Sequence, residues 1–230
     1  MMNEKSLVGI RALRELSSEA LANVARRCSW REVAPRSEII GYQDPSDDVF
    51  FVVNGQVKII IYSSSGKAVT FRTLQAGEMF GELAAIDGQR RSASVQAISR
   101  CLIAQMTSRA FWDLAESEPA VTRAVLLHLV GLIRSLSTRV YEFSTLAVQN
   151  RIHAELLRLA RDGAAADNGV LLAKAPTHSD IASRISTHRE AVARELSRLA
   201  KLGLVRRQGT GLFITDLHRL TRMVAEATEE

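Results

Sequence analysis

The hydrophobic pattern of the first hundred residues changes from a helical to a strand-like period. Between residues 17 and 27, Leu21, Val24 and Ala25 fall on one side of a helix that Ser17 or Ser18 can cap. From residue 30 onward, β-branched and aromatic residues form short runs separated by turn residues. These runs cover residues 38–41, 49–53, 57–62, 69–74, 79–80, 93–97 and 101–106. Short strands at this spacing predict a sandwich or roll of antiparallel strands.

Turn residues mark the connections between these runs. Asn54-Gly55 separates two strand-like runs by two residues and predicts a tight hairpin between them. Further turns are predicted at residues 44–48, 63–66 and 76–77, which are rich in glycine, serine, proline and aspartate.

A long helix is predicted after the strands. Ser108 can cap a short segment over residues 109–115, and Glu118-Pro119 marks the start of the long helix. Within it, apolar residues recur at alternating steps of three and four, the heptad spacing of a helix that packs against a partner. The seam consists of Leu126, Leu129, Ile133, Leu136, Val140, Phe143 and Ala147. We expect a parallel homodimer, because one small roll cannot cover so long an apolar side. Packing of the seam on the chain's own roll is the alternative.

The pattern of the last third of the chain is helical again. An amphipathic helix is predicted over residues 149–162, followed by a polar loop over 163–169 with a turn at Asp167-Asn168-Gly169. Residues 177–180 have the sequence of a capping box and open a short helix. Ser186-Thr187 breaks that helix and is expected to cap a second one.

Two short helices joined by a tight turn match helix-turn-helix geometry, in which the second helix lies in the major groove of DNA. Val192, Leu196 and Leu199 form the predicted buried stripe of this second helix. A hairpin over residues 204–214 is predicted to form a wing whose arginines, Arg206-Arg207, contact backbone phosphate. Residues 226–230 are predicted to be a solvated tail.

Composition limits the class of protein. The chain has 230 residues and 47% hydrophobic content, which suits one or two domains with real cores. The longest apolar run, residues 125–133, lies between Arg123 and Arg134 and is expected to be too short to span a bilayer. Residues 1–11 lack the features of a signal peptide, which favours a cytoplasmic location.

The two cysteines, Cys28 and Cys101, offer neither a disulfide framework nor a metal-binding spacing. We therefore expect no metal, haem or iron–sulfur cofactor, because an iron–sulfur cluster needs a group of cysteines. The net charge of +5 is compatible with a nucleic-acid partner.

Residues 80–95 contain the chain's clearest candidate for a binding site. Gly81 lets the backbone approach a ligand closely, and Glu82 can accept hydrogen bonds from ribose hydroxyls. The free amides at the start of the short helical turn beginning near Leu83 can face a phosphate. Arg91 can close on that phosphate with a charge-assisted, bidentate pair. The stretch therefore predicts a pocket for an anionic sugar-phosphate.

This stretch resembles the phosphate-binding cassette of cyclic-nucleotide-binding domains, found in bacterial CRP/FNR regulators and in the regulatory subunits of cyclic-AMP-dependent kinases. The resemblance rests on the Gly-Glu-Leu triplet at residues 81–83, on Gly88 and on Arg91-Ser92-Ala93. It implies that Glu82 binds the ribose 2′-hydroxyl and that Arg91 and Ser92 bind the cyclic phosphate. It also assigns the backbone approach to Gly81 and Leu83.

The same resemblance implies contacts to the nucleotide base from the long helix. Alignment through Arg151 places Ser137 and Thr138 at the base, with exposure of Thr138 to solvent as the alternative. The implied effector is cyclic AMP. Cyclic GMP stays open, because the hydroxyl of Ser92 can serve either a phosphate or the amino group of a guanine.

The second helix of the predicted helix-turn-helix resembles the recognition helix of the same family. Its exposed start carries His188, Arg189, Glu190 and, one turn on, Arg194. The resemblance assigns base reading to Arg189, Glu190 and Arg194, and phosphate contact to Thr177. Arginine matches the acceptors of guanine, and glutamate can accept from the amino group of cytosine. Alternatively, Glu190 completes a capping box with Thr187, and Arg194 pairs with Glu190 along the helix.

Together the motifs predict an α+β chain with three parts. These are an N-terminal antiparallel β-roll that binds cyclic nucleotide (residues 1–117), a dimerisation helix and hinge (118–147), and a C-terminal winged helix-turn-helix (148–230). The predicted function is that of a cyclic-nucleotide-responsive homodimer that binds a palindromic site in double-stranded DNA. RNA polymerase is a further partner that the resemblance implies.

Two alternatives remain. One is a regulator of the same fold with a vestigial or different effector site. The other is an enzyme acting on cyclic nucleotides. The enzyme has little support, because the five histidines show no ligand pairing and no nucleophile motif or P-loop is present.

Overall fold

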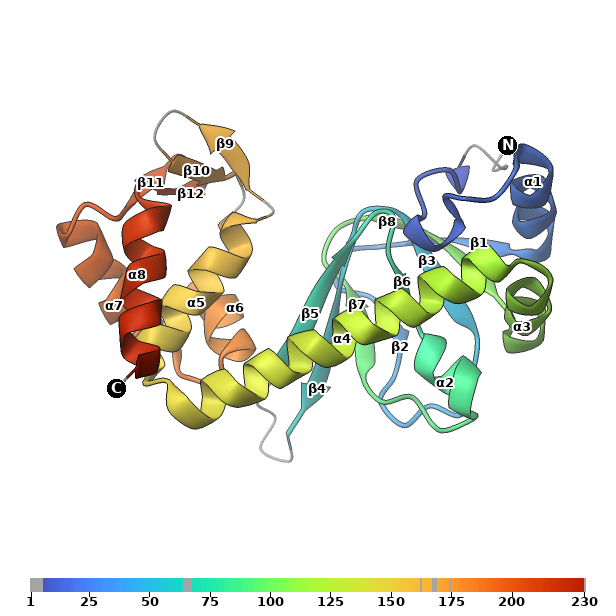
Figure 1. The fold of residues 1–230 in the computed structure, drawn as a ribbon, viewed down its shortest axis with the longest axis horizontal. Helices are drawn as coiled ribbons and strands as arrows, with labels where there is room; N and C mark the ends of the chain where they lie inside the picture. Colours follow the sequence, from blue (N-terminus) through green and yellow to red (C-terminus); the bar gives the residue numbers. More distant parts are fainter. Residues whose placement is uncertain (1–5, 64–67, 162, 167–168, 174, 230) are drawn as a thin grey trace. The chain divides into compact units, whose positions relative to one another are not determined.

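The computed structural model of the chain describes residues 6–63, 68–161, 163–166, 169–173 and 175–229 (Figure 1). The chain forms two compact units, Met1–Ile133 and Arg134–Glu230. The boundary between them falls inside helix α4 (Pro119–Thr145), which is a single helix. The functional division expected at residues 117 and 147 stays a prediction.

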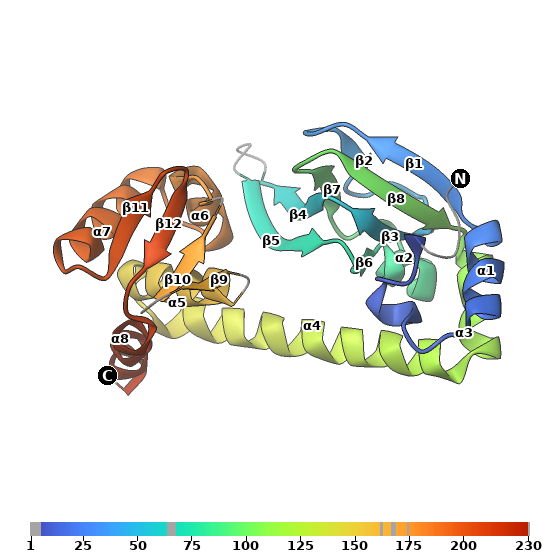
Figure 2. The ribbon, with the colours of Figure 1, turned by 90° about the horizontal axis from the view of Figure 1, so that it is seen from above.

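The first unit contains a roll of two four-stranded antiparallel sheets, as the sequence predicts. One sheet has the order β1-β8-β3-β6 and the other β2-β7-β4-β5 (Figure 2). The strands of the first sheet are β1 (Ser29–Val33), β8 (Cys101–Met106), β3 (Val49–Asn54) and β6 (Met79–Phe80). Those of the second are β2 (Glu38–Ile40), β7 (Ser94–Ala97), β4 (Gln56–Tyr62) and β5 (Ala68–Gln75). The sequence predicts all of these except β1.

The hairpin predicted at Asn54-Gly55 is wrong. Strand β3 pairs with β8 and β6, whereas β4 pairs with β5 and β7, so the chain passes from one sheet to the other at Gly55. Gly55 has a φ of +90°, and a Cβ there would lie 2.4 Å from the carbonyl oxygen of Arg100. The glycine is needed because another backbone segment crosses close to this corner. The turn predicted at residues 63–66 falls mostly outside the described residues.

Helices close one end of the roll. Helix α1 (Ser18–Arg27) is capped by Ser17, as predicted, and lies beside α3 (Ser108–Ser117), with an ion pair of 2.5 Å between Arg27 and Asp113 (Figure 2). Thr107, and not Ser108, caps α3 through a bond to the amide of Ala110. The Ser108 hydroxyl instead donates to the carbonyl of Ala85.

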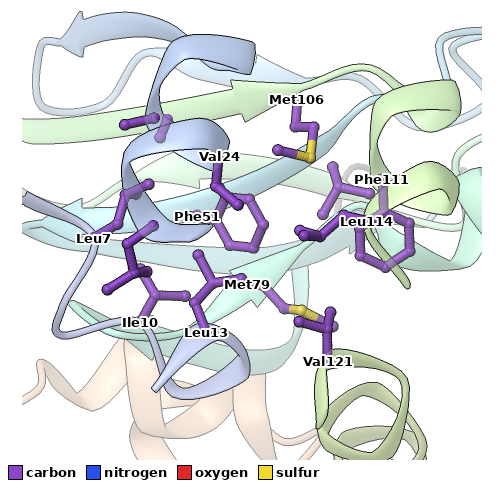
Figure 3. Packing of buried hydrophobic residues seen from close by; sticks show 14 of the residues in the cluster. Leu7, Ile10, Leu13, Val24, Phe51, Met79, Met106, Phe111, Leu114 and Val121 are labelled. Carbon is purple, nitrogen blue, oxygen red and sulfur yellow. The ribbon is translucent and has the colours of Figure 1, made fainter. Parts of the chain in front are cut away.

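The core of this end is built from segments far apart in sequence. Leu7, Ile10 and Leu13, around a short 3-10 helix (Arg11–Leu13) that the sequence pattern did not predict, are buried against the sheet (Figure 3). Phe51 and Val121 belong to the same cluster, so the start of α4 is anchored in the core of the first unit.

The predicted heptad seam is largely exposed in the single chain. Leu126, Ile133 and Val140 are 58%, 63% and 65% exposed, whereas Leu129 packs against the core of the first unit. Ala147 lies beyond the end of α4, because it is the N-cap residue of the next helix, so the seam ends one step earlier than predicted.

Helix α4 is also apolar enough to be considered as a candidate membrane-spanning helix. Among the described residues it is the one helix that could cross a bilayer by length and composition, with a mean hydropathy of 1.4 over its best window. The apolar run is part of this 27-residue helix, so the length of the run alone does not exclude a span. Packing argues against one, because Val121 and Val125 are buried in a core and Arg139 and Glu142 form ion pairs.

In its described residues the second unit combines the end of α4 and four further helices with a small sheet of order β11-β12-β10-β9 (Figure 1). The helices are α5 (Val148–Ala160), α6 (His178–Arg184), α7 (Arg189–Lys201) and α8 (Leu217–Glu229). The strands are β9 (Ala164–Ala166), β10 (Gly169–Leu172), β11 (Val205–Gln208) and β12 (Gly211–Ile214). The predicted wing is confirmed as the β11–β12 hairpin.

Two expectations for this unit are wrong. The stretch 163–169 is not only a loop, because Ala164–Ala166 pairs with the following strand. The turn residues Asp167 and Asn168 lie outside the described residues. Residues 226–229 do not form a free tail, because they continue α8, but Glu226 is exposed as predicted.

Candidate effector site and DNA-reading surface

The cassette begins at a position that requires glycine. Gly81 has a φ of +85°, and a Cβ there would lie 2.7 Å from the carbonyl oxygen of Asp48 and 2.8 Å from Nη1 of Arg91. Gly81 precedes the short helix α2 (Glu82–Asp87), which Gly88 ends with a φ of +69°. Glycine is therefore required by the close approach of the Asp48 carbonyl and the Arg91 guanidinium, and the approach of this backbone to a ligand stays a prediction.

The Arg91 side chain is fixed by the protein itself. The residue is only 2% exposed, and its Nε donates to Oγ of Ser46 at 3.1 Å. Nη1 donates to the carbonyl of Gly81 at 2.9 Å and Nη2 to that of Asp48 at 2.8 Å. A guanidinium has five N–H groups, so these bonds leave one on each terminal nitrogen for a ligand. The guanidinium carbon lies 5.6 Å from the centre of the Phe50 ring.

Acidic side chains surround this guanidinium. Burial lowers the pKa of Arg91, and the carboxylates of Asp48, Asp44 and Asp47 act in the opposite direction. The guanidinium keeps its charge at any physiological pH, because arginine is not deprotonated in proteins. A phosphate that binds here must compete with these carboxylates for the positive charge.

A backbone strap holds the cassette against the β2–β3 connection. The amide of Gln43 donates to the carbonyl of Arg91, and the amide of Arg91 donates to the carbonyl of Asp44, both at 3.0 Å. Arg90 is exposed and donates from Nη1 to the carbonyl of Gln43 at 2.9 Å. The strap fixes the backbone of the arginine that the sequence assigns to phosphate.

Glu82 has a partner that the sequence pattern did not identify. Its carboxylate is buried, and Oε1 lies 3.2 Å from Nε2 of His128 on α4. Leu83 and Ser92, the neighbouring predicted site residues, are both exposed. The structure thus brings Gly81, Glu82 and Arg91 together and adds His128. The one signal in the sequence is that His128 interrupts an otherwise apolar helical run.

Ser137 and Thr138 lie on the part of α4 that belongs to the second unit. Both are exposed, and the Thr138 hydroxyl donates to the carbonyl of Arg134 at 3.0 Å. Their contact with a nucleotide base stays a prediction.

The helix-turn-helix starts with the predicted capping box. Oγ1 of Thr177 accepts from the amide of Asp180, and the Asp180 carboxylate accepts from the amide of Thr177. The second helix begins differently from the prediction, because His188 and not Thr187 is its N-cap residue, with no side-chain cap bond. Thr187 is buried after Ser186, whose φ is +51°. Glu190 therefore completes no capping box with Thr187.

The side chains predicted to read DNA are exposed together at the start of α7. They are His188, Arg189, Glu190 and Arg194. Among the described residues no ion pair joins Glu190 to Arg194, so the alternative role for this pair has no support here. Arg189 and Thr177 also line a cavity of about 650 Å³ together with the wing residues Arg206 and Arg207. The wing and the start of α7 thus present their cations on one continuous surface.

A buried carboxylate ties the elements of the second unit together. Glu155 on α5 is 1% exposed and pairs with Arg158 beside it, with Arg184 at the end of α6 at 3.2 Å, and with Arg139 on α4 at 3.7 Å. Glu142 on α4 also pairs with Arg158, with an oxygen at 2.6 Å. Burial alone would lower the pKa of Arg158, but the two carboxylates outweigh it and raise that pKa.

A second buried pair holds the recognition helix. Nε2 of His153 on α5 lies 2.5 Å from Oε1 of Glu195 on α7, and Arg198 donates to the same oxygen at 2.7 Å. Burial lowers the pKa of His153, so the imidazole is neutral near pH 7 and donates from Nε2. Burial would raise the pKa of Glu195, but the bonds from Arg198 and His153 outweigh it and lower that pKa. A neutral His153 and a charged Glu195–Arg198 pair therefore fix α7 on α5.

Neither cysteine is part of these sites. Cys28 and Cys101 are free thiols, and burial raises the pKa of Cys28 to about 11 against the opposing charge of Arg27. Among the residues described, no group of three or more His, Cys, Asp or Glu side chains is placed to hold a metal ion. The expected absence of metal and haem stays a prediction.

Two family models match the chain in succession. Residues 30–118 match the cyclic nucleotide-binding domain, and residues 150–223 match the Crp-like helix-turn-helix domain. The first match contains the whole cassette, and the second contains α5 to the middle of α8.

Curated relatives and solved structures match over most of their length. The cAMP-activated global transcriptional regulator Vfr of Pseudomonas aeruginosa is 26% identical over 198 residues, covering 84% of this chain and 92% of Vfr. A CooA variant from Carboxydothermus hydrogenoformans has the same fold, with a TM-score of 0.79, 21% identity and coverage of 93% and 94% of the two chains. The c-di-GMP responsive regulator CLP of Xanthomonas campestris gives a TM-score of 0.75, with 18% identity and coverage of 86% and 99%.

Proposed function

Because the chain belongs to the CRP/FNR superfamily of transcription regulators, we propose that it acts as a homodimeric regulator whose DNA binding responds to cyclic AMP. The observation that carries the proposal is the pairing of two sites in one chain. Arg91 and Glu82 lie in the cassette of the first unit, where they would bind an anion and a ribose, and α7 exposes Arg189, Glu190 and Arg194 in the second.

The effector site supports a ribose cyclic phosphate by its chemistry. The two N–H groups that Arg91 keeps for a ligand can bind two oxygens of one phosphate, and Glu82 can accept from a ribose hydroxyl. The exposed Ser92 adds a hydroxyl that can donate to the phosphate. The fixed position of Arg91 lowers the entropy lost on binding, because its rotamer is already set by Ser46, Gly81 and Asp48.

A homodimer is supported by the exposed apolar seam of α4. Leu126, Ile133 and Val140 recur at heptad-like spacing and are mostly solvent-exposed in a single chain. Two seams packed in parallel would bury this surface. In the state that binds DNA, the proposal requires the two copies of α7 to lie about 34 Å apart, one turn of DNA. Sedimentation equilibrium tests this assembly. A chain that remains monomeric at micromolar concentration contradicts it.

In the proposed mechanism, cyclic nucleotide acts by binding more tightly to the conformation of the protein that binds DNA. A ligand shifts such an equilibrium only by its difference in affinity for the two states. Contact of the nucleotide with Arg91 and Glu82 in the first unit would reach the second unit through α4, which has residues in both. RNA polymerase contact is a further part of the proposal, implied by the family.

A different effector is the second candidate. The acidic side chains around Arg91 weaken its attraction for any phosphate, and the regulator CLP of the same fold is described as responsive to c-di-GMP. Titration calorimetry with cyclic AMP, cyclic GMP and c-di-GMP separates these cases. We expect cyclic AMP to bind most tightly. Binding of c-di-GMP alone supports the second candidate, and binding of none of the three contradicts the effector role.

Arg189→Ala is expected to flatten the sequence preference of DNA binding. A bidentate contact to guanine discriminates against a wrong base pair by about 1–3 kcal/mol, so the variant should lose roughly five- to 150-fold of discrimination at one position of each half-site. Arg207→Ala in the wing is the matched control, because loss of a phosphate contact should weaken all sequences alike and reduce the salt dependence. Binding of operator variants at several salt concentrations measures both effects. Equal weakening for every sequence by Arg189→Ala would remove its base-reading role.

A further inference from the structure

His128 contacts the carboxylate of Glu82, which the proposed effector site needs for binding ribose. Nε2 of His128 lies 3.2 Å from Oε1 of Glu82, and the Glu82 side chain is only 7% exposed. A ribose hydroxyl that donates to Oε1 must take the place of the imidazole or share that oxygen with it. Glu82 lies on α2 in the cassette and His128 on α4, so the contact joins the site to the helix that enters the second unit.

The protein offers the imidazole a second position. His128 also lines a cavity of about 320 Å³ between the start of α4 and the segment around the 3-10 helix. The other charged groups that line this cavity are Arg11, Arg14, Glu15, Glu78 and Arg123. Glu78 is already paired with Arg11 and Arg72, whereas Glu15 lies 3.8 Å from Arg14 and is 56% exposed. The imidazole of His128 therefore borders a polar cavity whose lining includes the carboxylate of Glu15.

We propose that His128 is the residue of α4 that detects an occupied effector site, because it bonds to Oε1 of Glu82 and competes with a ribose hydroxyl for that oxygen. The inference rests on the proposed function and deepens it. A ribose hydroxyl that takes Oε1 breaks the His128–Glu82 contact, and breaking it costs part of the binding free energy of the nucleotide. The same step releases the cassette from α4.

The test compares His128→Leu with His128→Gln. Leucine cannot bond to Glu82, whereas the amide nitrogen of glutamine can replace Nε2. Because the nucleotide no longer displaces a hydrogen bond, His128→Leu should bind cyclic AMP about three- to tenfold more tightly in calorimetry. It should also bind operator DNA more tightly without nucleotide, so that the ratio of DNA affinities with and without cyclic AMP falls. His128→Gln should restore both quantities toward the wild-type values.

Ser135→Ala is the control for a general effect of changing α4, since Ser135 is an exposed residue of the same helix. A gain in nucleotide affinity cannot arise from partial unfolding, so a damaged fold does not imitate the expected result. The inference is wrong, while the proposed function stands, if two results are found together. These are an unchanged or lower affinity of His128→Leu for cyclic AMP, and a wild-type ratio of its DNA affinities with and without cyclic AMP. If the wild-type chain binds no cyclic nucleotide, the proposed function fails, and the sensing role of His128 fails with it.

Discussion

Replacement of Arg91 by alanine is expected to weaken cyclic-nucleotide binding by at least tenfold, and by more than a hundredfold if both remaining N–H groups bind the phosphate. Hydrogen bonds that involve a charged group contribute about 1.5–3 kcal/mol each, and each 1.4 kcal/mol is a factor of ten in affinity. The guanidinium is held in place before the ligand arrives, so little of this free energy is spent on ordering the side chain.

Arg91 also supports the fold. The experiment must therefore distinguish a loss of nucleotide binding from a loss of folding. Arg91→Ala leaves the carbonyls of Asp48 and Gly81 without their donors in a buried place. Ser46→Ala removes the acceptor of Nε and a side-chain hydrogen bond to Asp44, and Arg90→Ala removes the exposed neighbour. Calorimetry with cyclic AMP should therefore show a large loss for Arg91→Ala and small changes for the two controls. Wild-type affinity in a folded Arg91→Ala protein would remove Arg91 from the site.

Glu155→Gln is expected to lower the free energy of unfolding of the second unit by about 3–5 kcal/mol. Breaking a buried ion pair by neutralising one partner leaves uncompensated charge in the interior, and this carboxylate has three arginine partners. Glutamine keeps the shape of the side chain, so the effect reports the charge and not a cavity. Only Glu142 would remain to compensate the guanidinium of Arg158.

Chemical denaturation followed by probes in each unit measures this effect. The transition of the second unit should move to lower denaturant concentration, while that of the first unit stays in place. Glu226→Gln, which breaks an exposed pair with Arg222 on α8, is the matched control and should change little. An unchanged transition for Glu155→Gln would show that the arginines do not depend on this carboxylate.

Local patterns in the sequence predict most of the strands and helices, because burial on one face imposes a period. The strands of the roll, the capping box at Thr177 and the wing all follow from local signals. The prediction of a hairpin at Asn54-Gly55 is wrong because the dipeptide Asn-Gly can form either a tight turn or a corner between two sheets. The choice depends on Arg100 and Cys101, which approach Gly55 from a strand far along the chain.

Local sequence patterns also predict part of the candidate effector site. A motif identifies Gly81, Glu82 and Arg91, but not the partners that hold them. Arg91 bonds to Asp48 and Ser46 across more than forty residues, and Glu82 meets His128 across a similar separation. The periodicity of hydrophobic residues along the sequence does not predict such long-range contacts. Helix α8 is not among the elements predicted from the sequence.

The most direct test of the account is the affinity of the wild-type protein for its operator with and without saturating cyclic AMP, at one fixed salt concentration. Allosteric coupling between two sites typically amounts to about 1–3 kcal/mol, so the account predicts that cyclic AMP tightens DNA binding by roughly five- to 150-fold. Equal DNA affinity in both conditions, with cyclic AMP shown to be bound, would contradict the claim that this site controls the reading of DNA.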